Sequence, residues 1–170
     1  MVTTAREAQR PATTTEQVWR ELTKASFAVI SQVTAAGAPR SSGVVYAVED
    51  RRLYAVVAPH SWKARHLAAD GRVAVTVPVH RGGVLALVAP IPPATISFHG
   101  HATVRPASVL PERLSHLVPA ERRASCRVVE IEPDGDFVLY GIGVPLLRMR
   151  EPATARARVP VSVSPPLPGE

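Results

Sequence analysis

Apolar and polar residues alternate along most of this chain with a period of two, which is typical of half-buried β-strands. Alternating or apolar runs rich in β-branched residues fall at 26–33, 41–49, 53–58, 72–79, 94–104, 126–133 and 137–150. Turn residues separate the first three runs, at "AAGAPR" and "DRR", so these runs are expected to form an antiparallel meander. The last two runs flank "DGD" and are expected to form a closing hairpin.

This pattern predicts an all-β fold with short helices, in which six to seven mainly antiparallel strands form a split barrel. A barrel is favoured because an antiparallel meander hides its edges most simply by closing on itself. A sandwich is the alternative. A parallel α/β fold is disfavoured because the connections between the first strands are too short to hold crossover helices.

Three short stretches have the pattern of helices. The segment 13–25 is amphipathic and has Thr14 and Gln17 at the spacing of a capping box, so it is expected to pack over the barrel. A second helix is expected to begin after the N-cap Ser61 and to stop at Gly71. The third is expected at 111–118.

At 170 residues the chain is long enough for one domain with a sizeable core. We expect a flexible leader at 1–12, the barrel domain at 13–150 and an extended, proline-rich tail at 151–170. The single cysteine, Cys126, excludes an internal disulfide and suggests a reducing compartment. The first residues do not resemble a signal peptide and the longest apolar run is too short to span a membrane, so a cytoplasmic protein is expected.

A net charge of +6 and a pI near 10.4 raise the question of nucleic acid binding. Nucleic acid is not the predicted partner, because the basic residues are spread along the chain, and aromatic residues make up only 5% and do not alternate with arginine. A local basic site for a small anion, such as a phosphorylated cofactor, fits this distribution better.

Lys63 is the residue that points most directly to such a site. It falls in the first turn of the predicted helix after Ser61, where a cation opposes the helix dipole unless an anion is bound. Arg40 opens the neighbouring strand, and its planar guanidinium is suited to the same anion. The alternative is that Lys63 and Arg40 are ordinary solvated surface cations.

Three segments in this order, "TAAGAPRSS", "RRLYAVVAPHSWKARHLAADGRVAVTV" and "ISFHGHATV", resemble the flavin-binding split-barrel proteins related to pyridoxamine 5'-phosphate oxidase. The resemblance covers about residues 16–150. It implies a homodimer that binds FMN at its interface, with the flavin phosphate held by Arg40, Ser61 and Lys63. The apolar segment 82–93, which a monomer would have difficulty covering, also favours a dimer.

The resemblance also implies the surroundings of the flavin ring. Backbone groups of Val57 and Ala58 are expected to bond to the ring, and Thr95 occupies about the place where relatives put an amide or hydroxyl near it. The remaining candidate cofactor-binding residues are Ser41, Ser42 and Trp62. Trp62 stands where many relatives have a second basic residue. This difference implies weaker binding of the flavin phosphate, or an aromatic contact in place of the second cation.

The expected activity is that of a flavin-dependent oxidoreductase acting on an unknown small molecule. The oxidase of pyridoxine phosphate is expected to end with an arginine and histidine substrate motif, whereas this chain ends "VPVSVSPPLPGE", so that substrate is not predicted. The composition is typical of a GC-rich genome, in which relatives that use F420 are common, so the resemblance implies F420 as the alternative cofactor. A non-catalytic barrel that binds flavin or haem is the other alternative, and no side chain is predicted to act as acid or base.

Two histidines, His99 and His101, are expected on one face of a strand. A zinc or haem site there, completed by a third histidine, is a minor hypothesis, because no carboxylate or thiolate accompanies them. A position at the barrel rim or in a dimer contact is favoured, and no metal site is predicted.

Overall fold

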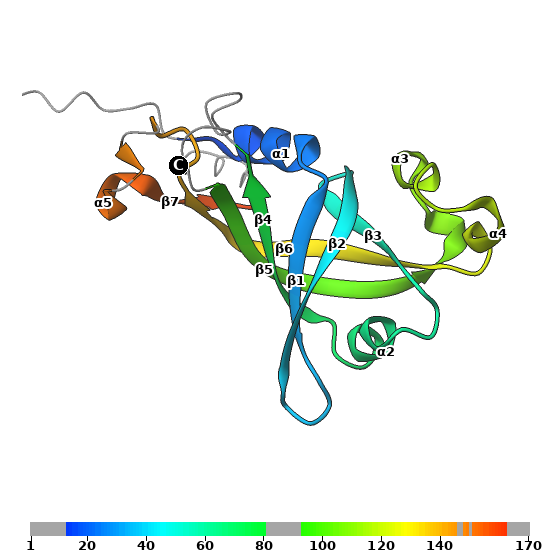
Figure 1. Ribbon diagram of the computed structural model, residues 1–170. Coiled ribbons are helices and arrows are strands. Elements are labelled where there is room, and N and C mark those ends of the chain that lie inside the picture. The colour runs from blue at the N-terminus through cyan, green and yellow to red at the C-terminus, as the bar shows by residue number, and fades with distance from the viewer. Residues whose placement is uncertain (1–12, 81–92, 146–147, 150, 163–170) are drawn as a thin grey trace, which may run out of the picture.

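The computed structural model describes residues 13–80, 93–145, 148–149 and 151–162 (Figure 1). The predicted leader 1–12 and most of the apolar segment 82–93 lie outside the described residues. In the described part of the chain, no helix has both the length and the apolar character needed to cross a membrane.

In the described part of the chain, seven strands form one antiparallel sheet with the order β3-β2-β1-β4-β5-β6-β7. A further pairing between β3 and β6 closes six of these strands into a barrel, which confirms the predicted fold class (Figure 1). The strand bounds are β1 Phe27–Val33, β2 Pro39–Glu49, β3 Arg52–Val57, β4 Arg72–Val79, β5 Ala94–Pro106, β6 Arg127–Tyr140 and β7 Arg156–Pro160.

The predicted closing hairpin around 134–136 is wrong, because β6 runs through this segment as one strand. Both halves of β6 pair with β5, and the register shifts where Ser97 pairs with Val138 but His99 pairs with Asp134. The extra residues of β6 therefore form a bulge instead of a turn. Gly135 has a φ of +69°, a left-handed conformation that glycine adopts without strain.

Part of the segment after residue 150 joins the sheet. The short helix α5, Pro152–Ala155, precedes β7, which pairs with β6. Two side chains of the first helix hold the end of this strand: Thr15 Oγ1 donates to the carbonyl of Pro160 at 2.9 Å, and Trp19 Nε1 donates to the carbonyl of Val161 at 3.3 Å. The expected extended tail is thus extended at 156–160, as a strand of the sheet.

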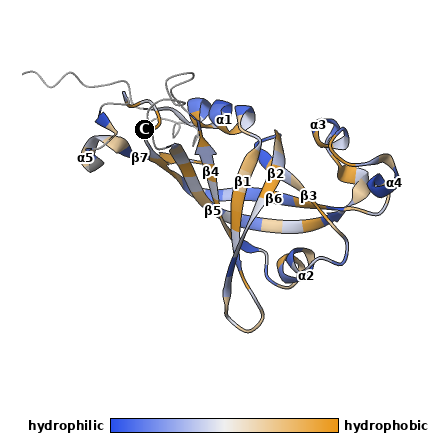
Figure 2. Cartoon of the chain, in the orientation of Figure 1, coloured by the Kyte–Doolittle hydropathy of each residue, from blue (hydrophilic) through white to orange (hydrophobic). Residues whose placement is uncertain are grey.

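The helix α1, Thr15–Lys24, covers one end of the barrel and begins with the predicted capping box of Thr14 and Gln17. Its polar residues lie mainly on the side away from the strands (Figure 2), and Trp19 and its other apolar residues are buried in the core. The Trp19 and Phe137 rings meet edge to face at 5.3 Å between centroids, and the Phe137 and Phe98 rings at 5.5 Å. This aromatic stack joins the helix to β5 and β6.

The helix α2, Trp62–Ala69, begins at the predicted N-cap Ser61, whose Oγ accepts a hydrogen bond from the N–H of Ala64 at 3.1 Å. The helix ends just before Gly71, close to where it was predicted to stop, and Asp70 is its extended C-cap. A Cβ on Gly71 would lie 2.5 Å from the carbonyl oxygen of Ala102, so glycine is required there for close approach to β5.

The connection between β5 and β6 consists of short helical turns, which are η2 Ala107–Val109, α3 Glu112–Ser115 and α4 Ala120–Arg123. The predicted helix 111–118 is therefore shorter than expected. The connection leaves β5 after Pro106 and returns at Arg127, and these two residues pair with each other. It projects beside β2 and β3 on the same side of the barrel as the start of α2 (Figure 1).

Candidate functional site

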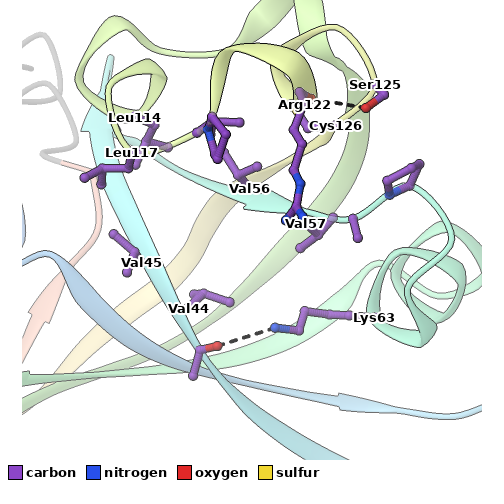
Figure 3. A pocket seen from close by; sticks show the side chains of 15 residues that line it. Val44, Val45, Val56, Val57, Lys63, Leu114, Leu117, Arg122, Ser125 and Cys126 are labelled. Carbon is purple, nitrogen blue, oxygen red and sulfur yellow. Dashed lines mark hydrogen bonds between the residues drawn. The ribbon is translucent and has the colours of Figure 1, made fainter.

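A cavity of about 670 Å³ lies between β2, the end of β3, the start of α2 and the connection 107–126 (Figure 3). Its volume is within the range of small-molecule sites. The lining residues are Gly43, Val44, Val45, Val56, Val57, Ala58, Pro59, Lys63, Leu114, Leu117, Val118, Pro119, Arg122, Ser125 and Cys126. Most of these side chains are apolar, so the cavity suits a ligand with a large apolar surface.

The β2 wall of the cavity follows from the alternation of that strand. Val44 and Tyr46 are buried in the core, so Gly43 and Val45 face outward, and Val45 is 49% exposed. A Cβ on Gly43 would lie 2.7 Å from the ring of Phe27, a residue of β1 that is itself 46% exposed. Glycine thus allows the Phe27 ring to lie against β2 beside the cavity.

Lys63 extends from the first turn of α2 towards β2, where its Nζ lies 3.4 Å from the carbonyl oxygen of Gly43 (Figure 3). Partial burial lowers the pKa of Lys63 from its ordinary value. No aspartate or glutamate is among the lining residues, and among the described residues Lys63 forms no ion pair. The charge of this ammonium group and the N-terminus of α2 both favour an anion here.

Of the nine candidate cofactor-binding residues, the cavity brings together Val57, Ala58 and Lys63. Ser61 lies beside the cavity as the N-cap of α2. Trp62 is 40% exposed, and its ring lies 5.7 Å from the ring of His66 on the same helix.

Arg40, Ser41 and Ser42 lie on the first part of β2 and do not line the cavity. Arg40 pairs with Gln32 of β1 and is exposed, whereas the hydroxyl of Ser41 lies 2.7 Å from that of Ser31. The alternation of the strand puts Arg40 and Ser42 on the opposite face from Gly43. The role of these three residues in cofactor binding stays a prediction.

Thr95 lies far from Lys63 within one chain. It pairs with Tyr140 at one end of β6, whereas Val57, beside the cavity, pairs with Arg127 at the other end. On β5, which spans the same pairs without the extra residues of the bulge, the eleven steps between Thr95 and Pro106 correspond to roughly 36 Å along the strand. The chain by itself does not bring Thr95 to the cavity.

Sequence reasoning missed the wall formed by the connection 107–126, and in particular Arg122 of α4. The Arg122 side chain extends into the cavity towards Val57 (Figure 3). Cys126, at the end of this connection, is buried and also lines the cavity. The sequence did contain a signal for this wall, which was the helical spacing of the apolar residues Leu114, Leu117 and Val118. An apolar stripe at this spacing normally packs against another part of the protein.

The histidine pair lies outside this cavity, on β5. His99 Nε2 is 4.0 Å from Asp134 Oδ2, and the ring of His101 lies against Gly71. Among residues with described positions, no group of three or more histidine, cysteine, aspartate or glutamate side chains is placed to hold a metal ion.

The family profile of pyridoxamine 5'-phosphate oxidase matches residues 14–142. No curated protein sequence matches the chain.

Solved structures with the same fold include an FAD-binding protein from Mesorhizobium loti, at 21% identity over 68% of this chain and 86% of that chain, with a TM-score of 0.52. An F420 reductase is 17% identical over 69% of this chain and 93% of its own, with a TM-score of 0.53. The haem storage protein HutZ from Vibrio cholerae is 12% identical over 74% and 94% respectively, with a TM-score of 0.58. At these identities the likeness concerns the fold alone.

Proposed function

Because the chain belongs to the pyridoxamine 5'-phosphate oxidase family, we propose that it binds a flavin-type cofactor in the cavity between β2, β3, α2 and the connection 107–126. The cofactor is FMN, with F420 as the alternative. The observation that carries this proposal is Lys63, a half-buried cation at a helix N-terminus that faces an apolar cavity with no carboxylate among its described lining residues.

The described residues fit the two chemical parts of such a cofactor. The Lys63 ammonium and the first N–H groups of α2 supply positive charge for a phosphate. Val45 and Val56 supply an apolar surface for a flat ring, and the backbone of Val57 and Ala58 lies at its edge. The neighbouring structures named for FAD and F420 agree with a flavin-type ligand in this fold.

The proposed reaction class is oxidation and reduction of a small molecule. A bound flavin supplies the hydride or electron transfer, and the protein supplies the phosphate grip, the ring orientation and exclusion of water. An apolar cavity partly closed by the connection 107–126 serves these tasks without a catalytic acid or base.

We further propose that the protein is a homodimer in which the partner subunit completes the cofactor site. Two observations support this arrangement. Thr95 does not line the cavity of its own chain and lies roughly 36 Å along the strand from it, so the predicted contact of Thr95 with the ring requires a second copy. Phe27 and Val45 also leave large apolar side chains exposed beside the cavity.

The cofactor assignment is tested with freshly purified protein, by its visible absorption spectrum and by mass analysis of the released ligand. FMN is then titrated into wild-type protein and into the Lys63→Ala variant. We expect affinity to fall about 10-fold to 100-fold, the usual size for a hydrogen bond to a charged group. Arg65→Ala is the matched control, because Arg65 is an exposed cation of the same helix that does not line the cavity. Equal FMN affinity in wild type and Lys63→Ala would refute the phosphate site.

Catalysis is tested separately from binding. The cofactor-loaded protein is reduced, and its reoxidation by quinones and other small acceptors is followed by absorbance. Acceptor-dependent turnover supports an oxidoreductase. Tight cofactor binding without turnover by any acceptor supports the alternative of a non-catalytic binding barrel.

A further inference from the structure

The guanidinium of Arg122 has no structural partner among the described residues, although its backbone is firmly held. The Arg122 N–H donates to the carbonyl of Pro119 at 2.9 Å, and the Arg122 carbonyl accepts from the N–H of Cys126 at 3.0 Å. The next residue differs, because Arg123 Nε donates to the carbonyl of Val118 at 3.0 Å and so has a role within the connection. Arg122 is an exposed residue, and its head group lies at the cavity without a hydrogen-bond or ion-pair partner among the described residues.

Arg122 and Lys63 enter the cavity from opposite walls (Figure 3). Lys63 comes from α2 and reaches towards Gly43, whereas Arg122 comes from α4 and extends towards Val57. Valines of β2 and β3 and the leucines of the connection lie around them. Because no acidic residue is among the lining residues that the structure describes, none of these neutralises either cation.

We propose that Arg122 binds the anionic group of the substrate, and that the substrate class is a small acid with a carboxylate or phosphate on an apolar body. This inference rests on the proposed function, in which Lys63 holds the cofactor and the substrate lies beside it. A planar guanidinium binds either acid group with two parallel hydrogen bonds. The apolar side chains of Leu114 and Leu117, which line the cavity on the same wall as Arg122, are placed to contact the body of the substrate.

The test uses flavin-loaded protein titrated with benzoate, phenyl phosphate and the neutral benzyl alcohol, with binding followed as a change in the flavin absorption spectrum. Arg122→Ala is expected to weaken benzoate or phenyl phosphate binding about 10-fold to 100-fold. Arg122→Lys retains the positive charge but loses the planar guanidinium, so its affinity for these acids should lie between that of Arg122→Ala and that of wild type. Arg113→Ala is the matched control, because Arg113 is an exposed arginine of α3 that does not line the cavity.

A loss confined to one of the two acids supports the inference and identifies the acid group. Unchanged binding of both acids in Arg122→Ala overturns it, as does benzyl alcohol binding as tightly as benzoate. If Arg122→Ala weakens FMN binding as much as Lys63→Ala does, the arginine belongs to the cofactor site and the inference is wrong.

Failure of the proposed function has a different signature. If the protein binds no flavin-type cofactor, the acids are tested on the protein alone by equilibrium dialysis. Loss of benzoate or phenyl phosphate binding in Arg122→Ala, but not in Arg113→Ala, then supports the anion site without the flavin. No difference between these variants overturns the site as well.

Discussion

Phe137 should be one of the most costly side chains to truncate in this protein. It is completely buried on β6, and its ring makes edge-to-face contacts with Trp19 of α1 and Phe98 of β5. Phe137→Ala removes both contacts and leaves a cavity between the helix and the barrel, for which the expected loss is about 3–5 kcal/mol of the free energy of unfolding. In a chain of this length that loss lowers the melting temperature by about 6–20 °C.

The loss is measured by urea denaturation followed by tryptophan fluorescence and checked by calorimetry. Phe27→Ala is the matched control, because Phe27 is 46% exposed and the same truncation should cost less than about 1.5 kcal/mol. If Phe137→Ala lies within about 1 kcal/mol of wild type, the aromatic stack does not join α1 to the barrel as described.

Three further predictions concern the cavity, the dimer and the sheet. Burial lowers the pKa of Lys63 in the folded state, so the unfolded chain binds the proton more tightly, and the free energy of unfolding should rise with pH between the folded and the unfolded pKa. Lys63→Met should raise the melting temperature at neutral pH and remove part of this rise. A pH dependence of stability equal to that of wild type would contradict this prediction. Val45→Glu should convert a dimer into a monomer in light scattering, and a wild-type monomer at micromolar concentration would refute the dimer. Gly100→Ala would place a Cβ 2.3 Å from the carbonyl oxygen of Glu132 and should cost about 1–3 kcal/mol of the free energy of unfolding, and a urea unfolding midpoint equal to that of wild type would refute this steric reason.

Features that depend on local sequence were predictable. Alternation and short turns identified six of the seven strands, and side-chain oxygens of Thr14 and Ser61 identified the starts of two helices. The place of Lys63 in the first turn of α2 was predictable for the same reason, because the position of the first turn follows from the N-cap.

Features that depend on which strands meet were not predictable. The residues 134–136 have turn chemistry, yet both halves of β6 pair with one long neighbour, and this pairing replaces the turn with a bulge. Arg122 lies at the cavity only because its connection projects over β2 and β3. Thr95 was expected near the ring, but its distance from Lys63 follows from the register of β5 and β6, which no local pattern specifies.

The connection 107–126 leaves and re-enters the sheet at paired residues, Pro106 and Arg127. Its ends are therefore already held together by the barrel, and its length contributes little to the closure of the sheet. The connection 107–126, which forms one wall of the cavity, can therefore be shortened, lengthened or replaced while the strands beneath it keep their pairing. Ligand preference can diverge among related barrels, or be redesigned in this one, by changing these twenty residues alone.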